Sequence, residues 1–397
     1  MRFLRVIRAR VSFIAVIVAF LFTITVGLHG LCRNKTLKMG SMYWSPRRAS
    51  QGGAFYKGIC EGCCSLAQNI VNGTSLVKRK NIVCFSRKIG EGEFYITHLT
   101  EFNPVYGYYL AMAKKFLADA FSAKRLMMNS GGELVWIIED DCTIHPTFIK
   151  LFYELRIPFL AHSIEKRSRS ASILVPNFHF IEKDGYRLLL KNLQKKGRDF
   201  RNRKPLIFWR GSDTGIPCSV SSLFERTCTK SCYTVQRVEM VKRSRVIPWI
   251  DARLTNLVQW CQKNHQKLFQ EGSFVPEKTP EVEWINFRGI LEIDGNVDAW
   301  GNRWRMQSGS IIFRVESPYI AHFTEKQISN VHYIPVSANL VDLVSATKII
   351  TSNLQTDVQK LENISRAAFE YSRSYTYYSQ VEELVEKLVL IWSNSSL

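Results

Sequence analysis

Two stretches of the sequence decide the fold: WRGSDTG at residues 209–215 and IDGNVDAWGNRWRMQSGS at residues 293–310. The first follows the apolar run PLIF at residues 205–208, so an arginine, a glycine and two hydroxyls stand where a strand ends. The second joins a glycine-rich turn to two arginines and closes on a Gly-Ser pair. Such loops at the carboxyl ends of strands usually bind nucleotide diphosphates, because glycine permits close backbone approach and arginine supplies a charged fork.

The pattern of apolar residues along the chain favours alternating strands and helices. A helical pattern at residues 110–128 precedes runs typical of buried strands at residues 134–138, 172–176, 205–209 and 311–315. Strands that alternate with helices form parallel α/β sheets. Near the end of the chain, helical spacing predicts a last core helix from Val381, Leu384, Val385, Leu388 and Val389.

The composition bounds the class of protein. The chain has 397 residues, of which 46% are apolar, so it is long enough for two domains with full cores. Its net charge of +20 suits an anionic ligand or a negatively charged membrane surface, although a solvated basic face accounts for the excess equally well. No zinc-finger or recognition-helix pattern accompanies the charge, so nucleic acid is not expected as a partner.

The N-terminus predicts a membrane anchor. Four arginines precede residues 11–31, a run without acidic residues, lysine or arginine. Its length matches the roughly 20 residues that a helix needs to cross a bilayer. The positive flank keeps the tip in the cytosol, which predicts a single-pass type II membrane protein of the endoplasmic reticulum or Golgi with its body in the lumen. The alternative is a cleaved signal peptide, whose apolar region is usually about 7–15 residues.

Sequons and cysteines agree with a lumenal placement. Four glycosylation sequons follow the predicted anchor, at Asn34, Asn72, Asn363 and Asn394. The chain has ten cysteines, most of which would pair in an oxidising compartment, although the sequence leaves their connectivity open. No second ligand pair stands at finger spacing from Cys60, Cys63 and Cys64, so we expect disulfides there and no metal.

Five motifs, found in one order, resemble glycosyltransferase family 90, the family of protein O-glucosyltransferases and fungal capsule-associated proteins. The resemblance covers about residues 133–345, and its motifs are ILVPNFHF (173–180), PLIFWRGSDTG (205–215), DARLT (251–255), SGSIIFRVESPYIAHF (308–323) and VHYIPV (331–336). It implies an α/β protein of GT-B type, in which two Rossmann-like domains face a cleft, here preceded by the N-terminal transmembrane anchor.

The expected domains follow from this architecture. A cytosolic tip (1–10), the anchor (11–31) and a stem (32–56) come before a Rossmann-like acceptor and base domain (57–200), a Rossmann-like nucleotide-sugar-binding domain (201–370), and a C-terminal helix and tail (371–397). The strongly basic run at residues 191–204 lies at the boundary between the two expected Rossmann-like domains.

The resemblance also implies an activity. It is that of an inverting, metal-independent glycosyltransferase, which transfers glucose or xylose from a UDP-sugar to a hydroxyl of a protein or glycan and needs no cofactor besides this donor. Two alternatives stay open. One is a metal-dependent transferase of the GT-A type, and the other is a catalytically inactive relative that acts as a lumenal binding protein.

The stretch ELVWIIEDDC at residues 133–142 supplies the candidate catalytic carboxylates. Its apolar strand brings Glu139, Asp140 and Asp141 to one place, where crowded like charges raise at least one pKa. A carboxylate at a strand end commonly serves as general base, and the resemblance points to Asp140, with Asp141 one residue away. Alternatively, the three carboxylates hold Mn²⁺ as in GT-A enzymes, or Asp141 caps a helix at residues 148–155.

Arg210 is the first candidate for neutralising the donor diphosphate. Gly211, Ser212 and Thr214 stand beside it, and the two hydroxyls can donate hydrogen bonds to phosphate oxygens. The alternative for Arg210 is a salt bridge that holds the two halves of the protein together. Arg243 resembles a basic residue that the family places between the same two motifs, and Arg245 is a near alternative.

The second loop departs from the family's pattern. The family places an arginine ahead of its Gly-Ser pair at a position that is a glycine here, so Arg303 and Arg305 are the candidates for phosphate contact. Gly309 and Ser310 are expected to start the helix or turn under the diphosphate. Many members carry a glutamate suited to the ribose hydroxyls shortly after the Ser-Pro-Tyr stretch; this chain has alanine there, which makes Glu316 the substitute.

Overall fold

The structure is a computed structural model. It describes residues 64–65, 67–68, 81–87, 94–100, 102–123, 132–138, 152, 157–166, 172–215 and 231–394, and all of these belong to one compact unit, Phe55–Leu397. The predicted anchor at residues 11–31 and the predicted catalytic residues Asp140 and Asp141, with Glu139, lie outside the described residues. Within the described ranges, no helix is long and apolar enough to cross a membrane.

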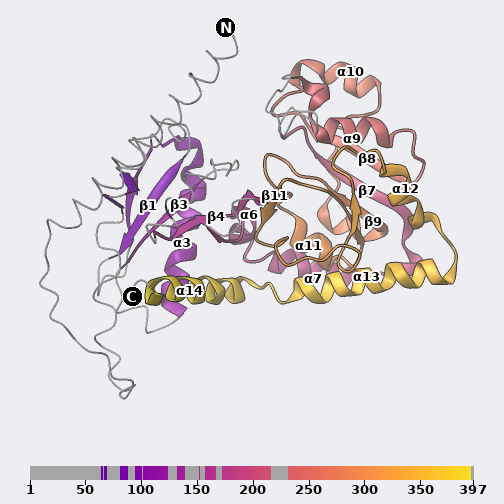
Figure 1. The fold of residues 1–397 in the computed structure, drawn as a ribbon. Helices are drawn as coiled ribbons and strands as arrows, with labels where there is room; N and C mark the ends of the chain where they lie inside the picture. The colour runs from indigo at the N-terminus through magenta and orange to yellow at the C-terminus, as the bar shows by residue number, and fades with distance from the viewer. Residues whose placement is uncertain are drawn as a thin grey trace, which may run out of the picture. The chain divides into compact units, whose positions relative to one another are not determined.

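The first sheet is mixed and has the strand order β2-β1-β3-β4-β6 (Figure 1). Its strands are β1 (Ile82–Arg87), β2 (Tyr95–His98), β3 (Gly132–Ile137), β4 (Phe159–Ala161) and β6 (Ile173–Leu174). β1 is antiparallel to β2, because a connection as short as the one between them permits only a hairpin, and it is also antiparallel to β3. β3, β4 and β6 run parallel, so their carboxyl ends lie at one edge of the sheet.

The second sheet is parallel throughout and has the strand order β12-β10-β9-β7-β8. Its strands are β7 (Lys204–Ser212), β8 (Ile250–Asn256), β9 (Phe287–Glu292), β10 (Ile311–Val315) and β12 (Ile334–Val336). This is the 2-1-3-4-5 order of doubly wound folds, and the order reverses between β7 and β9. Ligands of such sheets bind beyond the carboxyl ends of the strands at that reversal.

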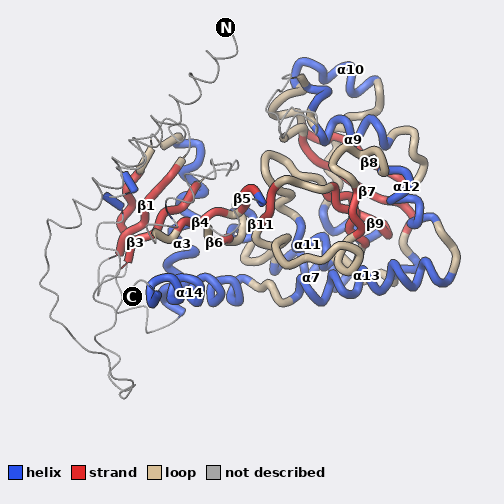
Figure 2. The backbone as a smooth tube through the Cα atoms, viewed as in Figure 1, coloured by secondary structure: helices blue, strands red, loops and turns tan. Residues whose placement is uncertain are grey.

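Helices pack against both sheets (Figure 2). They are α3 (Gly107–Ala123), α6 (Phe178–Glu182), α7 (Arg187–Lys196), α9 (Gln236–Ser244), α10 (His265–Gln270), α11 (Asn302–Gln307), α12 (Leu343–Thr347), α13 (Gln355–Arg373) and α14 (Tyr377–Asn394). α14 packs against α3, α9 against β8, and α13 against both α11 and β10. The expected C-terminal helix is therefore confirmed, with Val381, Leu384, Val385 and Leu388 buried.

A pair of short strands and a common apolar cluster connect the two sheets. A two-stranded antiparallel ribbon pairs β5 (Ser163–Glu165), which follows β4, with β11 (Tyr319–Ala321), which follows β10. One apolar cluster contains Trp136 of β3, Phe208 of β7 and Trp304 of α11, so the core runs from one sheet to the other. The expected α/β class with parallel strands is confirmed, whereas the expected domain boundaries stay predictions.

Two disulfides lie within the described residues. Cys64 pairs with Cys84 of β1, and Cys232 pairs with Cys261 after β8. Both bonds join segments distant in sequence, and they agree with the expectation that cysteines of this chain pair in an oxidising compartment.

Candidate functional site

A cavity of about 630 Å³ lies at the reversal point of the parallel sheet. Arg210, Ser212 and Thr214 reach it from the carboxyl end of β7, and Asn256 reaches it from that of β8. The loop that follows β9 supplies a further part of its wall, residues 295–298. Its volume falls within the roughly 300–1,000 Å³ that is usual for small-molecule sites.

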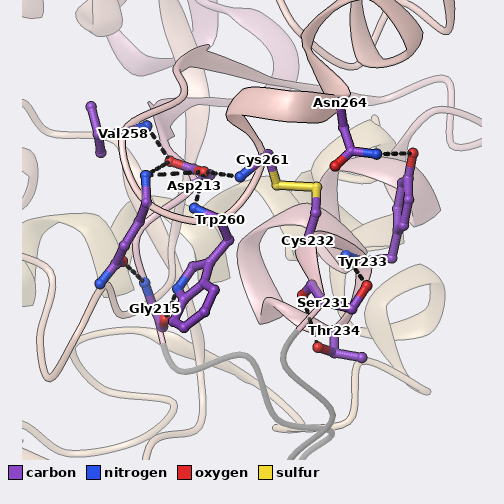
Figure 3. Close-up of a disulfide and its surroundings, with 11 residues drawn as sticks. Asp213, Gly215, Ser231, Cys232, Tyr233, Thr234, Val258, Trp260, Cys261 and Asn264 are labelled. Atoms are coloured by element: carbon purple, nitrogen blue, oxygen red, sulfur yellow. Dashed lines mark hydrogen bonds between the residues drawn. A yellow bond between two sulfur atoms is a disulfide. The ribbon is translucent and has the colours of Figure 1, made fainter.

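Asp213 fixes the loop after β7. Its carboxylate is fully buried and accepts backbone N–H bonds from four consecutive residues after β8, at 2.6–3.3 Å, which are Val258, Gln259, Trp260 and Cys261 (Figure 3). The disulfide between Cys232 and Cys261 holds the same turn. The side chain of Asp213 points into this turn. Its neighbours Ser212 and Thr214 therefore present their hydroxyls, which are 3.1 Å apart, to the cavity.

Gly211 allows Trp209 to pack closely against the backbone of the same loop. A Cβ atom at this position would lie 2.5 Å from Cζ2 of Trp209, which is buried in the core. The close approach therefore requires glycine. The predicted donor contact of Gly211 stays a prediction, since the residue is not part of the cavity lining.

Arg210 lines the cavity, but its guanidinium is already engaged. Nη1 donates to the carbonyl oxygens of Trp209 and Asp251 at 2.9 Å, and Nη2 donates to Oδ2 of Asp251 at 3.0 Å. The group also lies over the ring of Phe208, 4.3 Å from its centroid. The salt bridge considered as the alternative thus exists, but it joins neighbouring strands of one sheet. Arg210 is held rigidly at the cavity wall, with part of its donor capacity used.

Arg237 of α9 ties the two cavity loops together, and sequence analysis did not identify it. It donates to the hydroxyl of Thr214 at 2.7 Å on the β7 side, and to the carbonyl oxygens of Asp294 at 2.8 Å and Ile293 at 3.2 Å on the β9 side. Desolvation lowers the pKa of Arg237 to about 10, so the group remains charged at neutral pH. Its place in a basic helix beside Arg243 was the only signal in the sequence.

Arg305 lines the cavity as well, and two of its donor atoms are unused within the described part of the chain. Its Nε and Nη1 atoms are buried, and neither has a hydrogen-bond partner among the described residues. Glu292 lies 3.7 Å from Nη1, and the guanidinium is 5.5 Å from the ring centroids of Trp284 and of Trp304. Desolvation lowers the pKa of Arg305. Buried donors without partners are costly, so an anionic ligand is the natural acceptor for them.

Arg303 points elsewhere. The two arginines stand on α11, where residues two apart face different directions. Arg303 is buried, donates to the carbonyl oxygen of Gly185 and lies over the ring of Phe180, 5.5 Å from its centroid. It packs one half of the described chain onto the other and does not line the cavity.

Gly309, Ser310 and Arg243 also lie off the cavity. Gly309 turns the chain with a φ of 72°, and Ser310 accepts from Arg203 and donates to the carbonyl oxygen of Phe287, which places both at the amino end of β10. Arg243 is on the exposed side of α9, where it bonds Glu239 and the carbonyl oxygen of Asn339. Donor contacts of these three residues stay predictions, with the structure placing none of them in the cavity lining.

A second, smaller cavity of about 240 Å³ adjoins the first, and the two share Val297 and Asp298 in their walls. Glu316, the predicted ribose contact, lines this smaller cavity together with Asp294 and Arg314. Burial raises the pKa of Asp294 to about 6. The predicted site residues are thus divided: Arg210, Ser212, Thr214 and Arg305 line the larger cavity, and Glu316 lines the smaller one.

Comparison with known proteins identifies relatives. A model of the family described as "Glycosyl transferase family 90" matches residues 133–394. Protein O-glucosyltransferase 3 of Homo sapiens is 26% identical over 153 residues, which are 37% of this chain and 28% of that protein. Protein O-glucosyltransferase 2 of Danio rerio is 27% identical over 138 residues, 34% of this chain and 23% of that protein. The chain therefore spans about a quarter of the length of these relatives.

Solved structures give weaker matches. The pneumococcal O-GlcNAc transferase GtfA in complex with UDP and GlcNAc has a TM-score of 0.32 and 12% identity, over 61% of this chain and 54% of that one. The GtfA/B complex has a TM-score of 0.35 and 13% identity, over 62% of this chain and 48% of that one.

Proposed function

The chain belongs to glycosyl transferase family 90, and from this premise we propose that it transfers glucose or xylose from a UDP-sugar to a hydroxyl of a protein or glycan. The observation that carries the proposal is the position of Arg305. Arg305 lines a cavity at the strand-order reversal of a parallel sheet, where such sheets bind nucleotides, and two of its buried donors have no partner among the described residues.

In this proposal the cavity receives the donor diphosphate. Arg305 and the remaining donors of Arg210 neutralise its charge, and the hydroxyls of Ser212 and Thr214 donate to phosphate oxygens. Arg237 is a positioning residue, because its hydrogen bonds hold the two loops at a fixed separation. Preorganised cations of this kind stabilise the charge that develops on the departing diphosphate, which is the usual role of a metal in other transferases.

The reaction we propose is a single displacement with inversion. Asp140 or Asp141 takes the proton of the acceptor hydroxyl, the acceptor oxygen bonds to C1 of the sugar, and the bond from C1 to the diphosphate oxygen breaks. UDP leaves with the bonding electron pair. In a GT-B arrangement the base comes from the first Rossmann-like domain, which agrees with the acidic cluster following β3 directly in sequence.

Replacing Arg305 tests the donor site. Arg305→Gln removes a charged donor, and hydrogen bonds to charged groups contribute about 1.5–3 kcal/mol. We therefore expect the affinity for UDP, measured by isothermal titration calorimetry, to fall by roughly 10- to 150-fold. The matched control is Arg373→Gln, on the exposed side of α13, where the partner of the arginine within the described part of the chain is Glu370. Equal UDP affinity in wild type and Arg305→Gln would remove Arg305 from the site.

We also propose that the protein is a type II membrane protein of the endoplasmic reticulum or Golgi with a lumenal catalytic part. The sequons, the two disulfides and the apolar run at residues 11–31 support this placement. After expression with microsomes, we expect the full chain to resist carbonate extraction and its sequons to carry glycans. A mature N-terminus at or beyond Cys32, found by N-terminal sequencing, would show that the run is a cleaved signal peptide.

A further inference from the structure

The larger cavity changes character along its wall. Towards β7 and α11 it carries the arginines and hydroxyls described above. Elsewhere its lining is mainly aromatic, with Tyr109, His179 and Trp300, and it includes the carboxylates of Asp298 and Glu281 and the ammonium group of Lys183. A diphosphate is repelled by a carboxylate, whereas a sugar ring offers hydroxyl donors to a carboxylate and C–H groups to aromatic rings. The second part of the wall therefore suits the uncharged end of a nucleotide sugar.

Asp298 has the central position in this part. It is 9% exposed and lines both the larger and the smaller cavity, so it stands where the two adjoin. It belongs to the loop after β9, the same loop that Arg237 ties to the loop after β7. Its carboxylate is thereby placed at a fixed distance from the residues proposed to hold the diphosphate.

His162, between β4 and β5, packs beside this carboxylate. Its Nε2 lies 3.9 Å from Oδ1 of Asp298, and its side chain is fully buried. The ring meets Trp300 edge to face with centroids 5.8 Å apart. The backbone on both sides is also joined, since the hydroxyl of Ser163 donates to the carbonyl oxygen of Val297 at 3.4 Å. The loop after β9 that carries Asp298 is thus in contact with His162 and Ser163, the two residues that follow β4.

The surroundings of His162 connect this position to the expected catalytic base. β3 and β4 pair in parallel, with Trp136 beside Leu160, so Ile138 and His162 leave the first sheet at the same edge. The acidic cluster follows Ile138 directly in sequence. A sugar bound at Asp298 would accordingly lie between the diphosphate site and the edge from which the base is expected.

We propose that Asp298, which packs beside His162, accepts hydrogen bonds from ring hydroxyls of the donor sugar and so determines which sugar is transferred. The inference rests on the proposed function and adds to it the group that recognises the sugar. Trp300 lines the same part of the cavity and offers apolar surface to the ring. A purely structural role of the contact between Asp298 and His162 is the competing explanation, and the two explanations differ in what they predict for UDP and for UDP-sugars.

Measurements of UDP, UDP-glucose and UDP-xylose binding to the full-length protein distinguish the two explanations for Asp298. In Asp298→Asn we expect UDP affinity to stay within about twofold of wild type, while affinity for the preferred UDP-sugar falls by about 10- to 100-fold. His162→Gln should change the ratio of UDP-sugar to UDP affinity in the same direction and by less. Glu370→Gln, on the exposed side of α13, is the matched control.

Deoxy-sugar donors make the test direct. Wild type should bind one of the 2-, 3- or 4-deoxy analogues of the preferred UDP-sugar markedly more weakly, and Asp298→Asn should no longer distinguish that analogue from its parent. Equal losses of UDP and UDP-sugar affinity, or deoxy discrimination that survives the substitution, would overturn the role of Asp298. A wild-type protein that binds neither UDP nor any of these donors would instead refute the proposed function itself.

Discussion

Asp140→Asn is expected to lower the rate of sugar transfer by on the order of 10²–10⁴, with donor affinity close to that of wild type. The substitution preserves the shape of the side chain and removes its ability to accept a proton. Loss of a general base acts on the chemical step, so kcat should fall while binding of the UDP-sugar is retained. Steady-state kinetics together with calorimetric donor binding measure both quantities.

Asp141→Asn is the matched comparison. Its effect should be smaller, because it acts through the pKa of its neighbour or through the start of the helix predicted from the sequence at residues 148–155. If Asp141→Asn alone is inactive with intact binding, the base is Asp141 and the rest of the proposal stands. A metal site of the GT-A type would be identified by a different result. Both variants would lose donor binding, and the activity of the wild-type protein would depend on Mn²⁺ and be inhibited by EDTA. Unchanged turnover in both would make this strand end structural.

Asp213→Ala should be among the most destabilising single substitutions in the chain. It removes a fully buried carboxylate that accepts hydrogen bonds from the backbone of Val258, Gln259, Trp260 and Cys261. Each buried donor left without a partner costs about 1–3 kcal/mol, and water entering the space offsets part of the sum. We expect the free energy of unfolding to fall by roughly 3–5 kcal/mol, measured by denaturant unfolding followed by tryptophan fluorescence.

Glu370→Ala is the control for stability. Glu370 pairs with Arg373 on the exposed side of α13, and exposed pairs contribute about 0–1 kcal/mol. UDP affinity should also fall in Asp213→Ala, since the residue holds the loop that carries Ser212 and Thr214. A loss of stability below about 1 kcal/mol in this variant would mean that the turn after β8 is held by other contacts, the disulfide between Cys232 and Cys261 first among them.

Several helices and strands were predictable from the spacing of apolar residues in the sequence. The apolar runs at residues 134–138, 205–209 and 311–315 fall within or beside β3, β7 and β10, and the helical stripe near the C-terminus is α14. β4, β11 and β12 were not identified, because strands of three residues are too short to show a period of two. The antiparallel position of β1 was also missed, since local pattern carries no strand direction.

The candidate site was predictable in part. Residues that directly follow a strand, Arg210, Ser212 and Thr214, reach the cavity, because the end of a strand fixes where they lie. Spacing did not decide between Arg303 and Arg305, whose directions depend on α11 being a helix and on what packs beneath it. The only local signal for Arg237 was its place in a basic helix, and Asp298 gave none.

The sequence by itself determined the family, the α/β class and the loop proposed to bind phosphate, because each of these depends on residues close together in the chain. Only the tertiary structure decided that His162, directly after β4, lies beside Asp298 of the loop after β9, and that Arg237 joins the loops after β7 and β9. These contacts between distant residues depend on strand order and register, because β5 pairs with β11 and β7 lies between β8 and β9. Strand pairing over such distances is set by burial of the whole core, a property that no single stretch of sequence carries.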